Sequence, residues 1–103
     1  MIKIIFYVGE EKTCGVSVLS SDGSNFEFQS ATYEYVNGSG TVLLSGNATI
    51  DNIKKECSVL LEPSVTGSLK VLMTINPLLA TGGADTSRNV ETIVGKIQIV
   101  VNQ

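Results

Sequence analysis

The chain has 103 residues with 7 basic and 10 acidic side chains, so its net charge is −3, and its length predicts one domain over residues 1–103 with a modest core. This acidic balance, with Arg88 as the lone arginine, argues against a nucleic-acid partner, which needs clustered cations to displace phosphate counterions. The absence of histidine excludes Ser–His and Cys–His catalysis and removes the commonest metal ligand, and no apolar run is long enough to cross a membrane as a helix.

The residue types favour strands throughout the chain. Val, Ile and Thr supply 30 of the residues, whereas Ala, the best helix former, occurs 4 times. The first apolar run, residues 4–8, is shorter than a signal-peptide core, so we expect no secretory signal and synthesis in a reducing cytoplasm. Side chains of two kinds alternate, with a period of two, in the segments that we predict as half-buried strands, which are residues 1–8, 14–19, 26–29, 68–75 and 96–101.

Turn signals separate these strands. Ser21-Asp22-Gly23-Ser24 and Asn37-Gly38-Ser39-Gly40 both lie between strand-like runs, and the Asn-Gly pair predicts a type I′ hairpin. Residues 51–61 allow two interpretations: a turn at 52–55 followed by a strand, or a short helix with apolar side chains at helical spacing. We favour the turn and the strand, because the second half of the segment alternates.

Cys14 and Cys57 are both in phase with apolar neighbours, so we expect both side chains to point inward. Two inward cysteines on adjacent strands could form a disulfide. Buried free thiols that behave as small apolar groups are the interpretation favoured by synthesis in a reducing compartment.

Residues 76–89 form a long connection between two predicted strands, although hairpin loops usually span about two to five residues. Long loops in compact domains are often functional. This one carries Leu78, Leu79, Asp85 and Arg88, and arginine and exposed apolar groups are typical interface anchors. We predict these four residues as a candidate interface. In the alternative, the two leucines cap the open end of the core and the rest of the loop is mobile.

The first and last predicted strands are candidate sheet edges, and neither carries much charge. A sheet edge exposes unpaired N–H and C=O groups that can template another chain. Either these two strands pair with each other or are buried, or one of them docks on a neighbouring subunit.

No motif nominates a catalytic, metal or cofactor site. Asp85-Thr86-Ser87 resembles the aspartic protease triplet, but serine replaces the final glycine and no apolar strand precedes it. Two cysteines without histidine cannot complete a zinc site, and the aspartates are isolated. Gly82-Gly83 lacks the lysine of a phosphate loop. We therefore expect no catalytic residue, no metal and no cofactor.

A series of turn and strand signals runs along nearly the whole chain. In order, they are Gly9-Glu10-Glu11-Lys12-Thr13, Asp22-Gly23, Ser30-Ala31-Thr32-Tyr33, Asn37-Gly38-Ser39-Gly40, Ile50-Asp51, Gly67 with Leu69–Ile75, and Gly95-Lys96-Ile97-Gln98-Ile99-Val100. This order resembles a group of short phage Ig-like domains, including N-terminal domains of baseplate upper proteins and other tail-, fibre- or head-associated modules. The long 76–89 loop and Leu69, which stands where the pattern has an aromatic residue, depart from it. The resemblance implies a virion structural role without catalysis and carries no active-site residues.

Together, these features predict an all-β, Ig-like antiparallel sandwich of seven to nine short strands. We expect a non-enzymatic structural or interaction protein of a phage or prophage virion: a tail, baseplate or collar adaptor, or a capsid decoration protein. It would be made in the bacterial cytoplasm and assemble through edge strands and the long loop. Its expected partners are other virion structural proteins and a second copy of itself, with no nucleic acid and no membrane.

The alternative is a bacterial carbohydrate- or surface-binding module in the cytoplasm or on the cell surface. Tyr33 and Tyr35 share one face of a strand, so their rings could form a stacking platform for a sugar. The competing interpretation is that this face lies in the core. A small enzyme is disfavoured by the missing histidine and the absent motifs.

Overall fold

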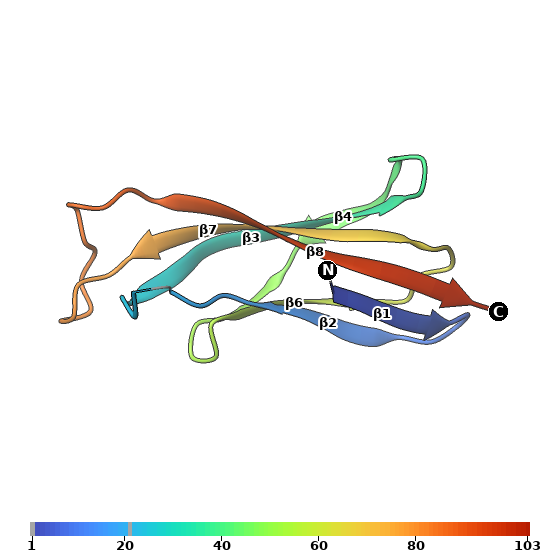
Figure 1. Cartoon of the computed structure of the whole chain (residues 1–103), viewed down its shortest axis with the longest axis horizontal. Coiled ribbons are helices and arrows are strands. Elements are labelled where there is room, and N and C mark those ends of the chain that lie inside the picture. The colour runs from blue at the N-terminus through green and yellow to red at the C-terminus, as the bar shows by residue number, and fades with distance from the viewer. Residues whose placement is uncertain (1, 21) are drawn as a thin grey trace.

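Eight strands form two facing sheets in the computed structural model, which describes residues 2–20 and 22–103 (Figure 1). None of these described residues is helical, which confirms the all-β prediction. Met1 and Ser21, which belong to the predicted first strand and first turn, lie outside the described residues. The strands are β1 (Ile2–Tyr7), β2 (Lys12–Ser17), β3 (Phe26–Asn37), β4 (Val42–Asn47), β5 (Thr49–Asp51), β6 (Glu56–Leu61), β7 (Gly67–Pro77) and β8 (Glu91–Asn102).

The larger sheet has the strand order β1-β8-β7-β3-β4 and the smaller one the order β2-β6-β5. Two sheets stacked in this way form an all-β sandwich, as predicted. The first and last strands pair with each other, but in parallel, from Ile2 opposite Ile97 to Tyr7 opposite Asn102. The expectation of a wholly antiparallel sandwich is wrong at this point. After β1 the chain crosses to the smaller sheet to form β2, so no hairpin joins β1 to its neighbour β8 and the two strands are free to run in parallel.

The core lies between the sheets and is built from the inward row of each strand. The predicted rows on β7 and β8 are confirmed, because alternate side chains of both strands are buried while those between them are more exposed. No charged or polar residue in the described part of the chain is buried. The largest fully buried side chains are Tyr35, Phe6, Leu61, Leu69, Met73, Ile97 and Ile99.

Two glycines mark places where the packing leaves no room for a side chain. A Cβ on Gly95 would lie 2.7 Å from Cγ1 of Val16, on the facing sheet. A Cβ on Gly67 would collide with the carbonyl oxygen of Val36 and come within 3.1 Å of the Tyr35 ring. Both glycines belong to the pattern of the phage domains, and both have a packing reason here.

The β3–β4 hairpin forms where predicted, but its turn type differs. Only Gly40 has a positive φ (85°) in this hairpin, so Asn37-Gly38 is not a type I′ pair. The side-chain Oδ1 of Asn37 instead accepts hydrogen bonds from the N–H groups of Ser39 and Thr41, each at 3.0 Å. The asparagine therefore organises a longer loop that closes at Gly40.

Residues 51–61 form a turn and then β6, which confirms the favoured interpretation over the short helix. Oδ1 of Asp51 accepts hydrogen bonds from the N–H groups of Ile53 and Lys54, each at 3.0 Å. Lys55 then adopts a positive φ of 56°, which a helix does not permit. The strand begins directly afterwards.

Candidate interaction site at the loop end

The long loop is residues 78–90, because β7 extends to Pro77 and β8 begins at Glu91. It projects from the end of the sandwich opposite the C-terminus, beside the connection between β2 and β3 (Figure 1). Leu78 forms an isolated bridge with Ala84, and the N–H of Asp85 donates to the carbonyl of Pro77 at 3.0 Å. The loop therefore continues the β7–β8 pairing for a short distance and is held by its own backbone.

The two leucines of the loop have different roles. Leu78 is half-buried, and its N–H donates to the carbonyl oxygen of Asn25 at 2.9 Å, which ties the loop to the β2–β3 connection. Leu79 leaves 46% of its surface exposed. Leu78 is thus partly covered where the loop meets the β2–β3 connection, while Leu79 is exposed and available to a partner.

Asp85 shapes the turn that follows. Its Oδ1 accepts hydrogen bonds from the hydroxyl of Ser87 at 2.5 Å and from the Ser87 N–H at 3.0 Å. These two bonds, the hydroxyl bond first, hold the pKa of Asp85 below its usual value. The carboxylate is engaged within the loop, so Asp85-Thr86-Ser87 is a polar turn, as its sequence context indicated.

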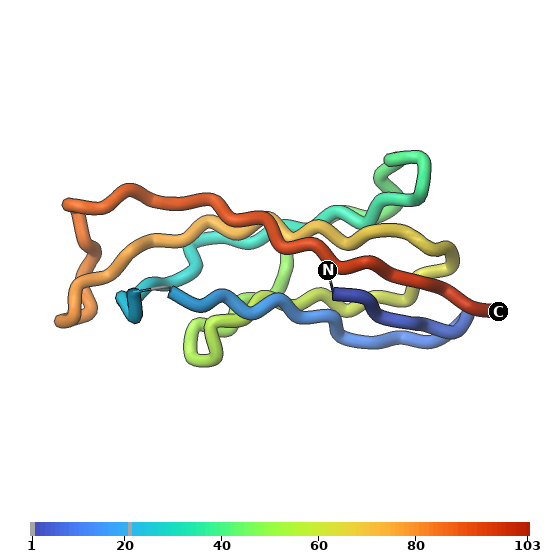
Figure 2. Tube along the Cα trace, in the orientation of Figure 1, coloured from blue at the N-terminus to red at the C-terminus, as the bar shows by residue number. Residues whose placement is uncertain are grey.

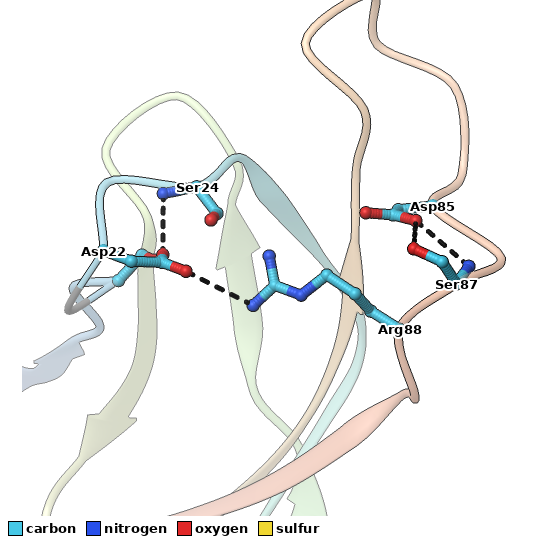
Figure 3. Close-up of polar contacts among 6 residues, drawn as sticks. Asp22, Ser24, Asp85, Ser87 and Arg88 are labelled. Atoms are coloured by element: carbon cyan, nitrogen blue, oxygen red, sulfur yellow. Dashed lines mark hydrogen bonds and ion pairs between the residues drawn. The ribbon is translucent and has the colours of Figure 1, made fainter.

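Arg88 points away from Asp85 and reaches across to the β2–β3 connection (Figure 3). Its Nη2 lies 3.8 Å from Oδ2 of Asp22. Hydrogen bonds from Ser20 and Ser24, with a smaller contribution from Arg88, hold the pKa of Asp22 well below its usual range, so this carboxylate is ionised at neutral pH. An exposed ion pair adds little stability, but this one aligns two loops that are far apart in the sequence.

A hollow of about 200 Å³ lies between these two loops. Its walls combine apolar side chains from the end of the core with charged groups at the rim, the arrangement typical of a site that accepts an apolar anchor. Leu19, 91% exposed, lies on the rim. The lining residues are Val18, Leu19, Ser20, Asp22, Ser24, Asn25, Phe26, Ile75, Pro77, Arg88, Glu91 and Ile93.

Of the four predicted interface residues, the structure brings only Arg88 to this hollow. Leu79 and Asp85 lie farther along the same loop. Sequence reasoning did not identify the aspartate partner of Arg88, because Asp22 and Arg88 belong to connections that meet only after the two sheets stack.

The predicted tyrosine platform is wrong. Tyr35 is 1% exposed, and its hydroxyl donates to the carbonyl oxygen of Val65. Burial raises the pKa of Tyr35. Tyr33 is half-buried and packs against the same core. The face that both rings share is the core face, since Tyr33 pairs with Val71 and Tyr35 with Leu69.

Sequence reasoning did not identify β4 as an exposed sheet edge, because it considered only the first and last strands as candidate edges. β4 lies at the edge of the larger sheet, on the opposite side from β1 (Figure 2). Val42, Leu43 and Leu44 are 46%, 43% and 46% exposed. The available signal was three consecutive apolar residues that do not alternate, directly after a turn.

The cysteines are free and buried, and they lie diagonally rather than opposite each other: Cys14 pairs with Val59 and Cys57 with Val16. Burial raises the pKa of both thiols. Across residues 2–20 and 22–103, no three His, Cys, Asp or Glu side chains gather closely enough to hold a metal ion. The described part of the chain also has no helix of a length and apolarity that could span a bilayer.

The fold defines the class of protein as an all-β sandwich. No family model, curated protein or solved structure matches the chain.

Proposed function

We propose that the chain is a non-enzymatic structural module of a phage or prophage virion, as a tail, baseplate or collar adaptor or a capsid decoration protein. The observation that carries this proposal is the apolar surface at the loop end. Leu19, 91% exposed, lines a hollow that an apolar anchor fits, and Leu79 and Val90 of the long loop are 46% and 50% exposed. Exposed apolar groups gathered beside charged ones are typical of protein interfaces.

The size of this surface suits repetitive assembly. A single anchor in a hollow of about 200 Å³ makes a modest contact. A symmetric particle presents many copies of one site, so modest contacts gain strength when several are made together. The expected partners are other structural proteins of the particle, made in the same bacterial cytoplasm.

The resemblance to phage Ig-like domains supports the virion setting. Gly67 and Gly95, which belong to that pattern, are positions that the sandwich keeps free of side chains. The non-enzymatic part of the proposal rests on the sequence, which has no histidine, and on Asp85, whose carboxylate is engaged within its own turn.

The test is to induce prophages in the bacterial strain that encodes the chain and to purify the released particles on a density gradient. Mass spectrometry should find the chain at a fixed ratio to the major particle protein. The Leu79→Asp variant should lower that ratio by about tenfold or more, because a charge would replace an exposed apolar side chain of the proposed contact surface. Leu60→Asp, which changes an exposed leucine on the smaller sheet, is the matched control and should leave the ratio unchanged.

Particles that lack the wild-type chain would overturn the proposal. Equal loss in both variants would show that the loop end is not the binding surface.

A further inference from the structure

The two edges of the larger sheet differ in how they meet solvent. At β1, side chains occupy two of the outward backbone groups in its second half. Nζ of Lys12 donates to the carbonyl oxygen of Ile5 at 2.8 Å, and the N–H of Tyr7 donates to Oε1 of Glu10 at 3.1 Å. Lys12 and Glu10 also pair with each other at 3.1 Å. These side chains block a further strand from adding beside β1.

At β4, the outward backbone groups are free. The N–H of Ala48 donates to the carbonyl of Ala31 at 2.9 Å, which sets the phase of the ladder with β3. Because antiparallel ladders alternate, the N–H and C=O groups of Ser45 and Asn47 point away from β3. Within residues 2–20 and 22–103, the backbone of Val42–Asn47 makes no hydrogen bond outside the β3–β4 pairing.

The side chains of β4 do nothing to discourage pairing. The strand contains no charged residue and no proline, which natural sheet edges use as protection. Its one irregularity is the bulge at Leu43, next to the hairpin, which leaves the rest of the strand regular.

The strand is complementary to itself in one antiparallel register. In a new antiparallel ladder, the residues whose N–H and C=O groups point away from β3 must lie opposite each other and exchange hydrogen bonds. Ser45 is such a residue, so it would face Ser45 of a second copy across a two-fold axis. Leu44 would then face Gly46 of the second copy. Gly46 has no side chain, and the Tyr33 ring borders the space that its Cβ would occupy, at 3.3 Å. The half-exposed Leu44 of each copy would therefore lie against the Tyr33 ring that covers Gly46 of the other copy.

Charge also favours a second copy over a charged peptide. On the neighbouring strand β3, the charged residue Glu34 lies directly opposite Ser45 in the ladder, so both side chains project from the same face of the sheet. In the two-fold arrangement the two glutamates are separated by three strand spacings, about 14 Å. This exceeds the screening length of about 8 Å at physiological salt, so they barely repel. A charged partner would find no opposite charge on β4.

The geometry points to a homodimer formed by antiparallel pairing of β4 with β4 of a second copy, which joins two five-stranded sheets into one sheet of ten. The dimer and the proposed function both describe an assembly module, but the dimer is argued from β4 and does not depend on the contact surface at the loop end. Because one short strand on each side makes a small interface, the dimer should dissociate on dilution.

The test combines mass and hydrogen exchange. Sedimentation velocity from about 1 µM to about 1 mM should show a monomer–dimer equilibrium. The amides of Ser45 and Asn47 should gain protection from exchange as the concentration rises, while those of Lys3 and Ile5 should not. Ser45→Pro removes an outward N–H without breaking the ladder with β3, so it should weaken dimerisation at least tenfold.

Ser45→Lys is the second variant; it keeps the backbone intact, adds charge at the edge and should have the same effect. Ile5→Pro is the matched control, since it removes an outward N–H from the blocked edge β1, and it should dimerise like the wild type. A strict monomer at every concentration, or a dimer that both Ser45 variants retain, would overturn the inference. Particle composition is measured separately, so a monomer found in particles would refute the dimer and leave the proposed function standing.

Discussion

Replacing Gly95 by alanine would test how closely the two sheets pack. The added methyl would lie 2.7 Å from Cγ1 and 3.1 Å from Cγ2 of Val16, and 3.4 Å from Cε of Met73. Val16 is β-branched and on the facing sheet, so it cannot turn aside easily. Overpacking of this kind costs about 1–3 kcal/mol. In a domain of this size, such a cost lowers the melting temperature by roughly 4–8 °C per kcal/mol.

A second substitution should relieve the first. Val16→Ala alone should cost about 1.6 kcal/mol, because it removes two methyl-sized groups from a partly buried position. In the Gly95→Ala, Val16→Ala double variant, the new methyl occupies the space that the valine has left. The double variant should therefore be more stable than the sum of the single effects predicts, by about 1 kcal/mol or more.

Urea unfolding of the wild type, both single variants and the double variant gives the coupling free energy directly. Gly38→Ala is the control, because no heavy atom lies within 4 Å of the added Cβ, and it should change stability by less than about 0.5 kcal/mol. Additive single effects, within about 0.5 kcal/mol, would refute the close approach of the sheets at Gly95.

Tyr35→Phe should lower the free energy of unfolding by about 0.5–1.5 kcal/mol in urea titrations, because it removes a hydrogen bond from a buried ring; no change would mean that the bond is absent in solution. Burial raises the pKa of Cys14 and Cys57 above the usual value of a thiol, so the folded chain holds these protons more tightly than the unfolded chain does. Stability should therefore fall as the pH rises past about 8.5, and a double alanine variant should show a shallower fall between about pH 8 and pH 10. Arg88→Ala should leave the melting temperature unchanged at every salt concentration, because its ion pair with Asp22 is exposed; a large loss would contradict this assignment.

Alternation along the chain predicted the inward rows of β7 and β8, because a period of two is a local property. It could not say which strands become neighbours. The parallel pairing of β1 with β8 and the edge position of β4 depend on contacts between distant segments. The turn type at Asn37 was missed for another reason: the dipeptide was judged by backbone preference, whereas the asparagine side chain decides the loop.

The candidate site shows the same division. Composition and loop length drew attention to Leu79 and Arg88, and both lie at the surface of the loop end. Periodicity placed Tyr33 and Tyr35 on one face without saying which face is inside. The acidic and polar neighbours Glu34 and Thr32, which alternate with the tyrosines and are exposed, were the indication that the rings point inward.

The parallel pairing of β1 with β8 has a mechanical consequence. The chain enters β1 at Ile2 and leaves β8 at Asn102, at opposite ends of the paired segment. Tension applied through these two points pulls the strands along their length in opposite directions. All the hydrogen bonds of the pair then bear the load together, whereas a hairpin pulled from its open end gives way one bond at a time. A chain held at both of these points would resist stretching through this contact, and its lifetime under load would follow the unfolding rate rather than the equilibrium stability.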